Sequence, residues 1–258
     1  MAQTIGRAID ILEYCSEAPR SLKQLAEMLG VHRSTAFRMV QTLAEAGFVR
    51  KNADGTYGVG FRLAGLAKTA LDQFDLRTVV HPYIERLGAK VGFTIQFAVV
   101  QGSHIIYVDK IEPPNSITLN TRIGGFVVIH TAGVSKAILA FLAPKEVSRI
   151  LSNATFERLT ENSITSRDAF IALLAEVRNN GWACDRGEYE TISNCIAAPV
   201  WDYSNRVVGA ISITAFREVA DITRLLEFLP TLIETTTAVS KELGWNGIKT
   251  DYPVEHAE

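Results

Sequence analysis

Two short helical patterns joined by a glycine turn dominate the first fifty residues of the chain. Ser21 is suited to cap a helix over 22–29, and Gln24, three residues further on, completes a capping box. Gly30 supplies the left-handed residue that commonly ends such a helix. A second helix is expected after the turn, and its inward stripe consists of Ala36, Phe37, Val40, Leu43 and Ala44. This spacing predicts two helices held at a tight turn.

A helical segment precedes this pair, and a hairpin follows it. The apolar residues of the first segment recur at helical spacing at Ile5, Ala8, Ile9 and Leu12. The extended runs 48–51 and 56–59 flank an Asp54-Gly55 pair, which is a strong hairpin signal. Three helices and a hairpin in this order predict a winged helix-turn-helix domain over residues 1–62.

Basic and hydroxyl side chains fall where such a domain meets DNA. The N-terminal half of a recognition helix reaches base edges, and a wing contacts the phosphate backbone. The residues expected to bind DNA are Ser21, Arg33, Ser34, Thr35, Arg38, Arg50 and Lys51. The alternative is a generic three-helix domain with solvated arginines. The order of two helices, a glycine turn and a basic hairpin favours DNA binding.

The charge of the chain is unevenly distributed. Its formal net charge of −2 argues at first against a nucleic-acid partner. Residues 1–65, however, carry eight Lys or Arg and six Asp or Glu, which leaves that segment at +2 and the remainder at −4. The average therefore hides a basic segment that coincides with the predicted DNA-binding domain.

A narrow apolar stripe follows the hairpin. Between Leu63 and Phe74 apolar residues recur at three- and four-residue steps, which predicts an amphipathic helix. This helix either packs on its own domain or pairs with a second copy. We assign residues 63–78 to a linker and dimerisation helix. Pairing would place two recognition helices about one DNA turn apart (~34 Å) on a palindromic operator, in a homodimer or a dimer of dimers.

The remainder of the chain alternates between helices and antiparallel strands. Helices are expected over 79–90 (with Pro82 in the first turn), 131–142, 145–151 and 167–179, and strands over 94–100, 105–111, 117–121, 196–200 and 207–214. Pro230 is expected to kink the helical region 220–243 or to start a second helix there. Residues 79–246 therefore predict an α+β domain, followed by a tail over 247–258.

Three stretches of this sequence resemble one protein family. In Gly181-Trp-Ala-Cys-Asp185-Arg-Gly-Glu188 and Cys195-Ile-Ala-Ala-Pro-Val-Trp201-Asp202, the spacing of small, acidic, aliphatic and aromatic residues follows a family signature, with a departure only at Trp201. The stretch 128–137 resembles a second family block, with Val-Ile before His130 and with Ser135 where the family usually has Pro-Leu and Gly. Residues 33–38 look like the family's recognition helix. From Ala8 to Gly244 the chain resembles the isocitrate-lyase-regulator (IclR) family of bacterial transcription factors.

The resemblance implies a GAF-like C-terminal domain that binds a small organic effector, usually a carboxylate. Carried over by position, the effector-binding groups are the amides of Gly133 and Val134, the side chains of Asp185 and Cys195, and the hydroxyls of Ser212 and Thr214. Their chemistry agrees with this role. The first amides of a helix form a natural carboxylate site, and residues two apart on a strand face the same side.

Each of these polar residues also has an explanation that involves no ligand. Asp185 could accept a hydrogen bond from a ligand hydroxyl, or it could only form a surface ion pair with Arg186. The two hydroxyls could be a cross-strand pair, and Cys195 could be a small buried apolar residue. The expected apolar wall consists of Phe97, Tyr107, Phe126 and Ile196, and its aromatic members favour an aromatic carboxylate as effector.

The competing class is a cysteine-dependent hydrolase that uses Cys195 and His130 with Asp185 or Asp202. No base is placed beside that cysteine, and the sequence has no nucleophile elbow, Walker loop, dinucleotide glycine fingerprint or His/Cys metal spacing. We therefore expect no enzyme activity, no cofactor and no metal. A purely architectural DNA binder would leave the second domain unexplained.

The cellular setting follows from composition. No run approaches the roughly 18–20 uncharged apolar residues of a membrane span. The N-terminal residues lack the pattern of a secretory signal. The three cysteines are an odd count without C-x-x-C spacing. These features predict a cytoplasmic protein without a membrane partner.

Overall fold

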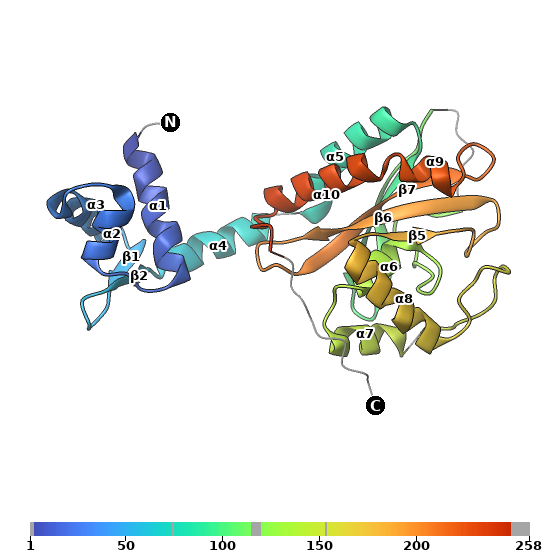
Figure 1. The fold of residues 1–258 in the computed structure, drawn as a ribbon, viewed down its shortest axis with the longest axis horizontal. Coiled ribbons are helices and arrows are strands. Elements are labelled where there is room, and N and C mark those ends of the chain that lie inside the picture. Colours follow the sequence, from blue (N-terminus) through green and yellow to red (C-terminus); the bar gives the residue numbers. More distant parts are fainter. Residues whose placement is uncertain (1–2, 74, 115–119, 153, 249–258) are drawn as a thin grey trace. The chain divides into compact units, whose positions relative to one another are not determined.

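The computed structural model describes residues 3–73, 75–114, 120–152 and 154–248. The chain divides into two compact units, Met1–Phe74 and Asp75–Glu258, whose elements are labelled in Figure 1. Among the described residues, none of the helices combines the length and the apolar character that a membrane crossing needs.

The first unit has the predicted winged helix-turn-helix architecture. Its elements are α1 (Gln3–Glu17), α2 (Leu22–Leu29), α3 (Arg33–Glu45), β1 (Val49–Lys51), β2 (Tyr57–Val59) and α4 (Arg62–Gln73). Strands β1 and β2 pair antiparallel, with Arg50 opposite Gly58. The two strands therefore form the hairpin that the Asp-Gly signal predicted.

Local sequence signals account for the ends of α2. The Ser21 side chain accepts a hydrogen bond from Gln24 N, and the Gln24 side chain accepts one from Ser21 N, so the capping box is confirmed. Gly30 ends the helix at φ 62°, a left-handed conformation that glycine adopts without steric cost. Together these residues fix both the start of α2 and the turn into α3.

The core of the first unit is narrower than the sequence predicted. It contains Ile11, Leu25 and Val40, which are fully buried. The prediction for Phe37 was wrong, because its side chain is 44% exposed. Helix α3 buries a stripe that contains Ala36 and Val40, and a residue one step after Ala36 is turned by about 100° away from that stripe.

The second unit contains a five-stranded antiparallel sheet. Its strands are β3 (Thr94–Gln101), β4 (His104–Ile111), β5 (Ala183–Asp185), β6 (Ser193–Trp201) and β7 (Val207–Phe216), in the order β4-β3-β7-β6-β5. Strand β5 was missed by the sequence analysis. The α+β class is confirmed.

Helices cover both faces of this sheet (Figure 1). One face packs against α5 (Leu76–Val91), α9 (Ile222–Leu226) and α10 (Leu229–Glu242), and the other against α6 (Gly133–Leu139), α7 (Pro144–Leu151) and α8 (Arg167–Asn180). Because side chains alternate along a strand, neighbouring residues enter different cores. Phe97 and Ile196 belong to the core beneath α5 and α10, whereas Cys195 and Ala197 belong to the other core.

Several helix ends differ from the prediction. Asp75 caps α5 by accepting a hydrogen bond from Arg77 N, so the helix begins earlier and Pro82 lies inside it rather than in its first turn. Helix α6 is shorter than the predicted 131–142. Ser166 caps α8, and Pro230 stands at the start of α10, as predicted.

The expected strand over 117–121 receives no support from the structure. Residues 117–119 of this segment lie outside the described residues. Asn120 and Thr121 are described, and neither belongs to a strand.

Candidate effector site and DNA-facing surface

The predicted recognition residues lie on the outer face of α3. Arg33, Ser34, Thr35 and Arg38 are all exposed. His32, which the sequence analysis did not single out, is the N-cap: its Nδ1 accepts from Ser34 N and lies 2.8 Å from Ser34 Oγ. The cap fixes the first turn of the helix and therefore the direction in which these side chains point.

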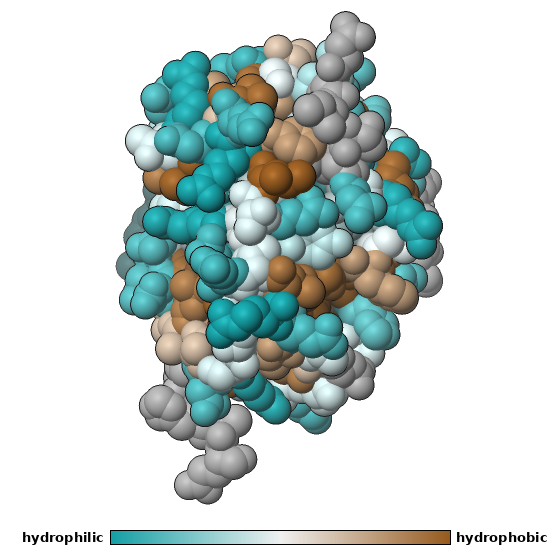
Figure 2. All heavy atoms as spheres, turned by 90° about the vertical axis from the view of Figure 1, so that its right-hand side faces the viewer, coloured by the Kyte–Doolittle hydropathy of each residue, from teal (hydrophilic) through white to brown (hydrophobic). Residues whose placement is uncertain are grey.

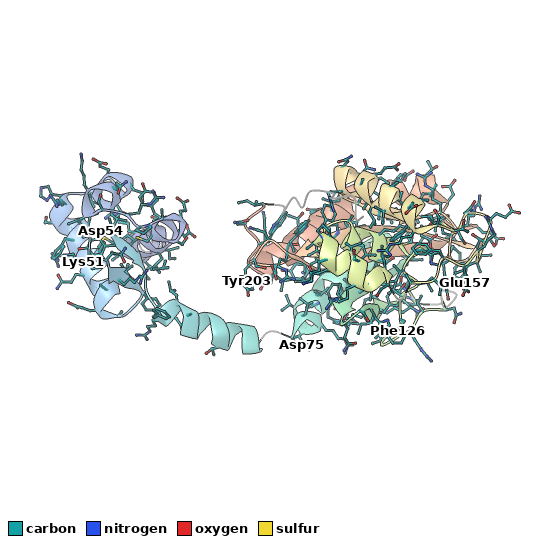
Figure 3. The ribbon with its side chains drawn as sticks, turned by 90° about the horizontal axis from the view of Figure 1, so that it is seen from below. Lys51, Asp54, Asp75, Phe126, Glu157 and Tyr203 are labelled. Carbon is teal, nitrogen blue, oxygen red and sulfur yellow. The ribbon has the colours of Figure 1, made fainter. Side chains whose placement is uncertain are left out.

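The hairpin carries the other predicted DNA contacts. Arg50 and Lys51 lie on β1 with exposed side chains, and Lys51 and Asp54 mark the hairpin in Figure 3. Within the described part of the chain, no carboxylate pairs with Arg33, Arg38, Arg50 or Lys51. All four cations are therefore available to an anionic partner.

The second unit contains a cavity of about 530 Å³. Each of the six predicted effector-binding residues lines it: Gly133, Val134, Asp185, Cys195, Ser212 and Thr214. The remaining lining residues are Gln96, Tyr107, Asn120, Thr121, Arg122, Gly125, Phe126, Val128, Ala132, Tyr189, Glu190 and Ser193. The volume falls in the range typical of small-molecule pockets.

The sheet register brings the floor of this cavity together. Asp185 on β5 is opposite Cys195 on β6, and Cys195 is opposite Thr214 on β7. In a neighbouring row, Ser212 on β7 is opposite Gln96 on β3. Residues opposite one another in adjacent strands share a face, so these side chains project to the same side of the sheet.

Helix α6 begins directly above this floor. As its first residues, Gly133 and Val134 have backbone N–H groups without an acceptor inside the helix. A Cβ atom on Gly133 would lie 2.9 Å from Cys195 Sγ and 3.3 Å from Ala197 Cβ. The absence of a side chain at position 133 therefore allows α6 to approach β6 closely.

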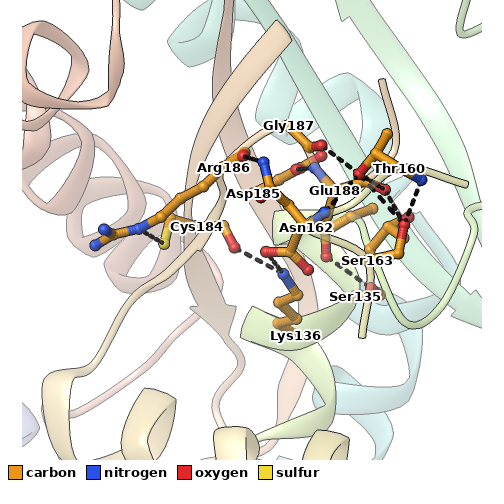
Figure 4. A network of polar contacts seen from close by, with 12 residues as sticks. Ser135, Lys136, Thr160, Asn162, Ser163, Cys184, Asp185, Arg186, Gly187 and Glu188 are labelled. Carbon is orange, nitrogen blue, oxygen red and sulfur yellow. Dashed lines mark hydrogen bonds and ion pairs between the residues drawn. The ribbon is translucent and has the colours of Figure 1, made fainter. Parts of the chain in front are cut away.

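A buried ion pair holds the loop that follows β5 (Figure 4). Lys136 is fully buried, and its Nζ donates to Glu188 Oε1 at 2.6 Å and to Cys184 O at 2.9 Å. Glu188 N in turn donates to Asp185 Oδ1 at 2.6 Å. The ammonium group thus connects α6 to the loop, and that loop fixes the Asp185 carboxylate at the cavity.

A second loop holds the same segment from its other side (Figure 4). Ser163 Oγ donates to Glu188 O at 2.7 Å, and Thr160 Oγ1 donates to Gly187 O at 2.7 Å. Asn162 Nδ2 donates to Arg186 O at 3.0 Å. Three consecutive carbonyls of the loop therefore have side-chain donors. The sequence analysis missed these residues, because their partners are distant in sequence.

Burial sets the electrostatics of the cavity floor. It raises the pKa of Asp185 to about 6, although the Glu188 amide and Lys136 act in the opposite direction. Burial also raises the pKa of Glu188 despite its ion pair with Lys136. The pKa of the Cys195 thiol rises to about 12, because burial and the nearby Asp185 both disfavour the thiolate.

Gln96 is the polar floor residue that the sequence analysis missed. Its side chain is almost fully buried, and its Oε1 accepts from Ser212 Oγ at 3.4 Å and from Thr214 Oγ1 at 3.2 Å. Its Nε2 donates to Thr121 Oγ1. One amide therefore links the two hydroxyls to the segment that crosses the cavity edge.

The aromatic wall is only partly as predicted. Tyr107 and Phe126 line the cavity, whereas Phe97 and Ile196 do not, because each alternates to the opposite face of the sheet. Phe126 is 70% exposed, lies at the surface of the second unit (Figure 3), and has its ring centroid 4.7 Å from that of His104.

The visible face of the second unit carries interspersed hydrophilic and hydrophobic residues (Figure 2). Exposed large apolar side chains of this unit include Ile192 and Tyr203. Single exposed apolar residues are normal on a globular surface and need no binding partner.

The hydrolase alternative lacks its base. A thiol with a pKa of about 12 is protonated at neutral pH. His130 does not line the cavity, and its Nε2 lies 2.9 Å from Glu157 O. In the part of the chain that the structure describes, no group of three or more His, Cys, Asp or Glu side chains is placed to hold a metal ion.

The family follows from both units. Residues 4–53 match the IclR helix-turn-helix domain, and residues 68–241 match the bacterial transcriptional regulator IclR C-terminal domain. The chain belongs to the IclR family. It resembles the DNA-binding transcriptional repressor YiaJ of Escherichia coli, with 32% identity over 251 residues that cover 95% of this chain and 89% of YiaJ.

Solved structures of this family have the same fold. The repressor BlcR of Agobacterium tumefaciens superposes with a TM-score of 0.77 at 22% identity, over 95% of this chain and 98% of BlcR. An IclR homologue of Microbacterium hydrocarbonoxydans, solved in complex with 4-hydroxybenzoate, superposes with a TM-score of 0.59 at 22% identity, over 93% and 98% of the two chains. These likenesses establish the fold.

The predicted function class and the predicted absence of enzyme activity are confirmed at the level of the family. The matched families and relatives are transcriptional regulators rather than enzymes. The chain is a DNA-binding transcriptional regulator with an N-terminal helix-turn-helix domain.

Proposed function

We propose that this regulator responds to a small aromatic carboxylate bound in the cavity of its second unit, and that the effector controls binding to a palindromic operator. The observation that carries the proposal is the lining of that cavity. Six residues from β5, β6, β7 and α6, which the family resemblance of the sequence predicts as effector-binding, lie around one space of about 530 Å³. Such a space suits a single-ring acid with room for water.

The lining offers a complementary partner for each part of such a ligand. The hydroxyls of Ser212 and Thr214 and the first amides of α6 would donate to the carboxylate. Asp185 would accept from a ring hydroxyl, which offsets its repulsion of an anion. Tyr107 and Phe126 would contact the ring. The 4-hydroxybenzoate complex of the Microbacterium homologue supports a hydroxylated aromatic acid as the first candidate.

The first unit binds the operator in this proposal. We propose that Arg33, Ser34, Thr35 and Arg38 contact bases and phosphates, while Ser21, Arg50 and Lys51 hold the phosphate backbone. We further propose a homodimer, alone or as a dimer of dimers, paired through the linker helix over 63–78. The apolar stripe at three- and four-residue steps between Leu63 and Phe74 supports this pairing, because such a stripe suits the packing of one helix against another.

Effector and operator are coupled through the arrangement of the two DNA-binding units in the dimer. A ligand that binds two arrangements equally shifts neither. The effector must therefore bind one arrangement more tightly, and the linker helix would transmit that preference.

The test is a panel of carboxylates measured by thermal unfolding and calorimetry on the full chain. A ligand at about 100 times its dissociation constant adds about 2.7 kcal/mol to the free energy of unfolding. Ser212→Ala should weaken 4-hydroxybenzoate by about tenfold or more, because it removes a hydrogen bond to a charged group. Ser204→Ala, in the exposed turn between β6 and β7, is the matched control and should bind normally.

Two outcomes would contradict the proposal. The first is a panel in which no aromatic carboxylate stabilises the protein. The second is hydrolysis of esters or amides by the purified protein that disappears with Cys195→Ala, since that result would assign the cavity to catalysis.

A further inference from the structure

We propose that the head-group specificity of the cavity beside Ser212 and Thr214 depends on Gln96, because its amide can rotate to match either a carboxylate or a neutral hydrogen-bond donor. The inference rests on the proposed function and deepens it. In this account the side-chain amide of Gln96 decides whether the two hydroxyls present protons or lone pairs to the ligand. The head group is a carboxylate in the first case and a neutral hydrogen-bond donor in the second.

Gln96 lies on β3, beside the central strand β7 of the sheet. Ser212 on β7 lies directly opposite Gln96 in the sheet register. Thr214 follows Ser212 two residues later on β7 and lies on the same face of the sheet. Gln96 is only 4% exposed and lines the cavity. Its amide must therefore satisfy its donors and its acceptor from the floor, the cavity edge and the ligand, because a buried polar group left unpaired is costly.

In the structure the carbonyl oxygen faces the hydroxyls. Ser212 Oγ and Thr214 Oγ1 both donate to Gln96 Oε1, at 3.4 Å and 3.2 Å, while Gln96 Nε2 donates to Thr121 Oγ1. A hydroxyl has one proton and two lone pairs. Once both protons point at Gln96, the hydroxyls offer the cavity only lone pairs, which receive an amide, hydroxyl or ammonium donor and repel a carboxylate.

Rotation of the amide by half a turn reverses this polarity. The two N–H groups of Nε2 then donate to Ser212 and Thr214, and both hydroxyl protons become free to donate to a ligand carboxylate. Oε1 would accept from Thr121 Oγ1, because a hydroxyl can donate as readily as it accepts. Every polar group keeps a partner in both orientations, so the head group of the ligand determines which one is populated.

Thr121 is held in place for this role. Its backbone oxygen accepts from Lys110 Nζ at 2.8 Å, which attaches the cavity-edge segment to β4. The backbone of Thr121 is therefore held beside Gln96, and the proton of its hydroxyl can turn.

The experiment compares two probes that differ only in the head group, benzoate and benzamide, by calorimetry at pH 8.5. Gln96→Glu introduces a carboxylate that only accepts, so both hydroxyl protons stay on it. Its negative charge also repels an acid directly, so the uncharged variant Gln96→Met decides between the two causes. Affinity for the acid should fall about tenfold or more, while affinity for the amide changes less than about threefold. Gln101→Glu makes the same change at the exposed end of β3 and should leave the ratio of the two affinities unchanged.

Gln96→Met is the complementary variant. It has nearly the same volume but no acceptor to compete for the hydroxyl protons, so the acid-to-amide affinity ratio should move in favour of the acid. Opposite shifts in the two variants support the proposal. Ratios that stay unchanged, or that move in the same direction, overturn it. If neither probe binds the natural chain, the proposal of an aromatic carboxylate effector is wrong, and so is the inference about Gln96 that rests on it.

Discussion

At the scale of single residues, the buried charged side chains at the cavity floor impose the main constraint on the fold. Asp185 is 5% exposed yet holds the backbone of Glu188, and Lys136 is fully buried between Glu188 and Cys184 O. A charge taken out of water is tolerated only with partners. The buried charges at the cavity floor therefore carry a cost in stability that depends on pH.

Asp185→Asn should remove part of this pH dependence. The pKa of Asp185 is raised from 3.8 to about 6 in the folded chain, so the native state binds more protons than the unfolded state between these values. Stability therefore falls as pH rises from about 4 to about 6, and a shift of this size corresponds to about 3 kcal/mol. The variant should lack that fall because Asn does not titrate, and its Oδ1 can still accept the hydrogen bond from Glu188 N.

Urea unfolding at intervals from pH 4 to pH 7.5 measures the effect. The stability of Asp185→Asn relative to the natural chain should increase across this range. Glu176→Gln, at an exposed position of α8, is the control. A constant difference between Asp185→Asn and the natural chain would refute the assignment of the raised pKa to Asp185.

The sequence identified some of the floor residues and not others for a physical reason. Ser212 and Thr214 could be placed on one face because they are two apart on a strand. Phe97 and Ile196 were misplaced because the sheet is covered on both faces, so an apolar residue fits either side. The place of Gln96 in the cavity lining could be recognised only from the strand register. A single polar residue in an apolar strand does not indicate which side chains lie opposite it.

At the scale of elements, the hairpin and α3 each carry two exposed cationic side chains on the first unit. Arg50 and Lys51 extend from β1, and Arg33 and Arg38 extend from α3. Contacts to DNA phosphates can be measured from the salt dependence of DNA affinity, because each neutralised phosphate releases a counterion.

The double variant Arg50→Ala/Lys51→Ala should therefore reduce the slope of log affinity against log salt by about 1.8 on a duplex of unrelated sequence. Fluorescence anisotropy between 50 and 200 mM salt (about the range over which this term changes affinity strongly) gives the slope. Arg86→Ala/Lys90→Ala removes the same charges from α5 of the second unit and should not change it. An unaltered slope in the hairpin variant would exclude the hairpin from the DNA contact.

The cap residues that were recognised in the sequence marked real helix ends, whereas some elements without a recognised signal were missed or misplaced. Ser21, Gly30 and Ser166 marked real helix ends. Strand β5 was missed because it is three residues long and its existence depends on pairing with β6. The start of α6 was misplaced because Ala132, its N-cap, makes no side-chain hydrogen bond and leaves no local signal.

At the scale of the whole molecule, the chain joins a unit that binds DNA to a unit with a cavity. The division at residues 74 and 75 places the basic segment 1–65 entirely in the first unit. The net charge of −2 is therefore the sum of a segment at +2 in the first unit and a remainder at −4. A regulator of this type requires a free-energy coupling between its two ligands, which is typically 1–3 kcal/mol.

The most direct test of the account is the affinity of the full chain for a duplex selected from a random library, measured with and without saturating 4-hydroxybenzoate. We predict a change of at least about fivefold in the dissociation constant, the lower end of such couplings. Arg38→Ala should lose the selected duplex while still binding the acid, and Ser212→Ala should bind the duplex but respond only at higher acid concentrations. An unchanged dissociation constant, with the acid shown by calorimetry to be bound, would contradict effector control of DNA binding.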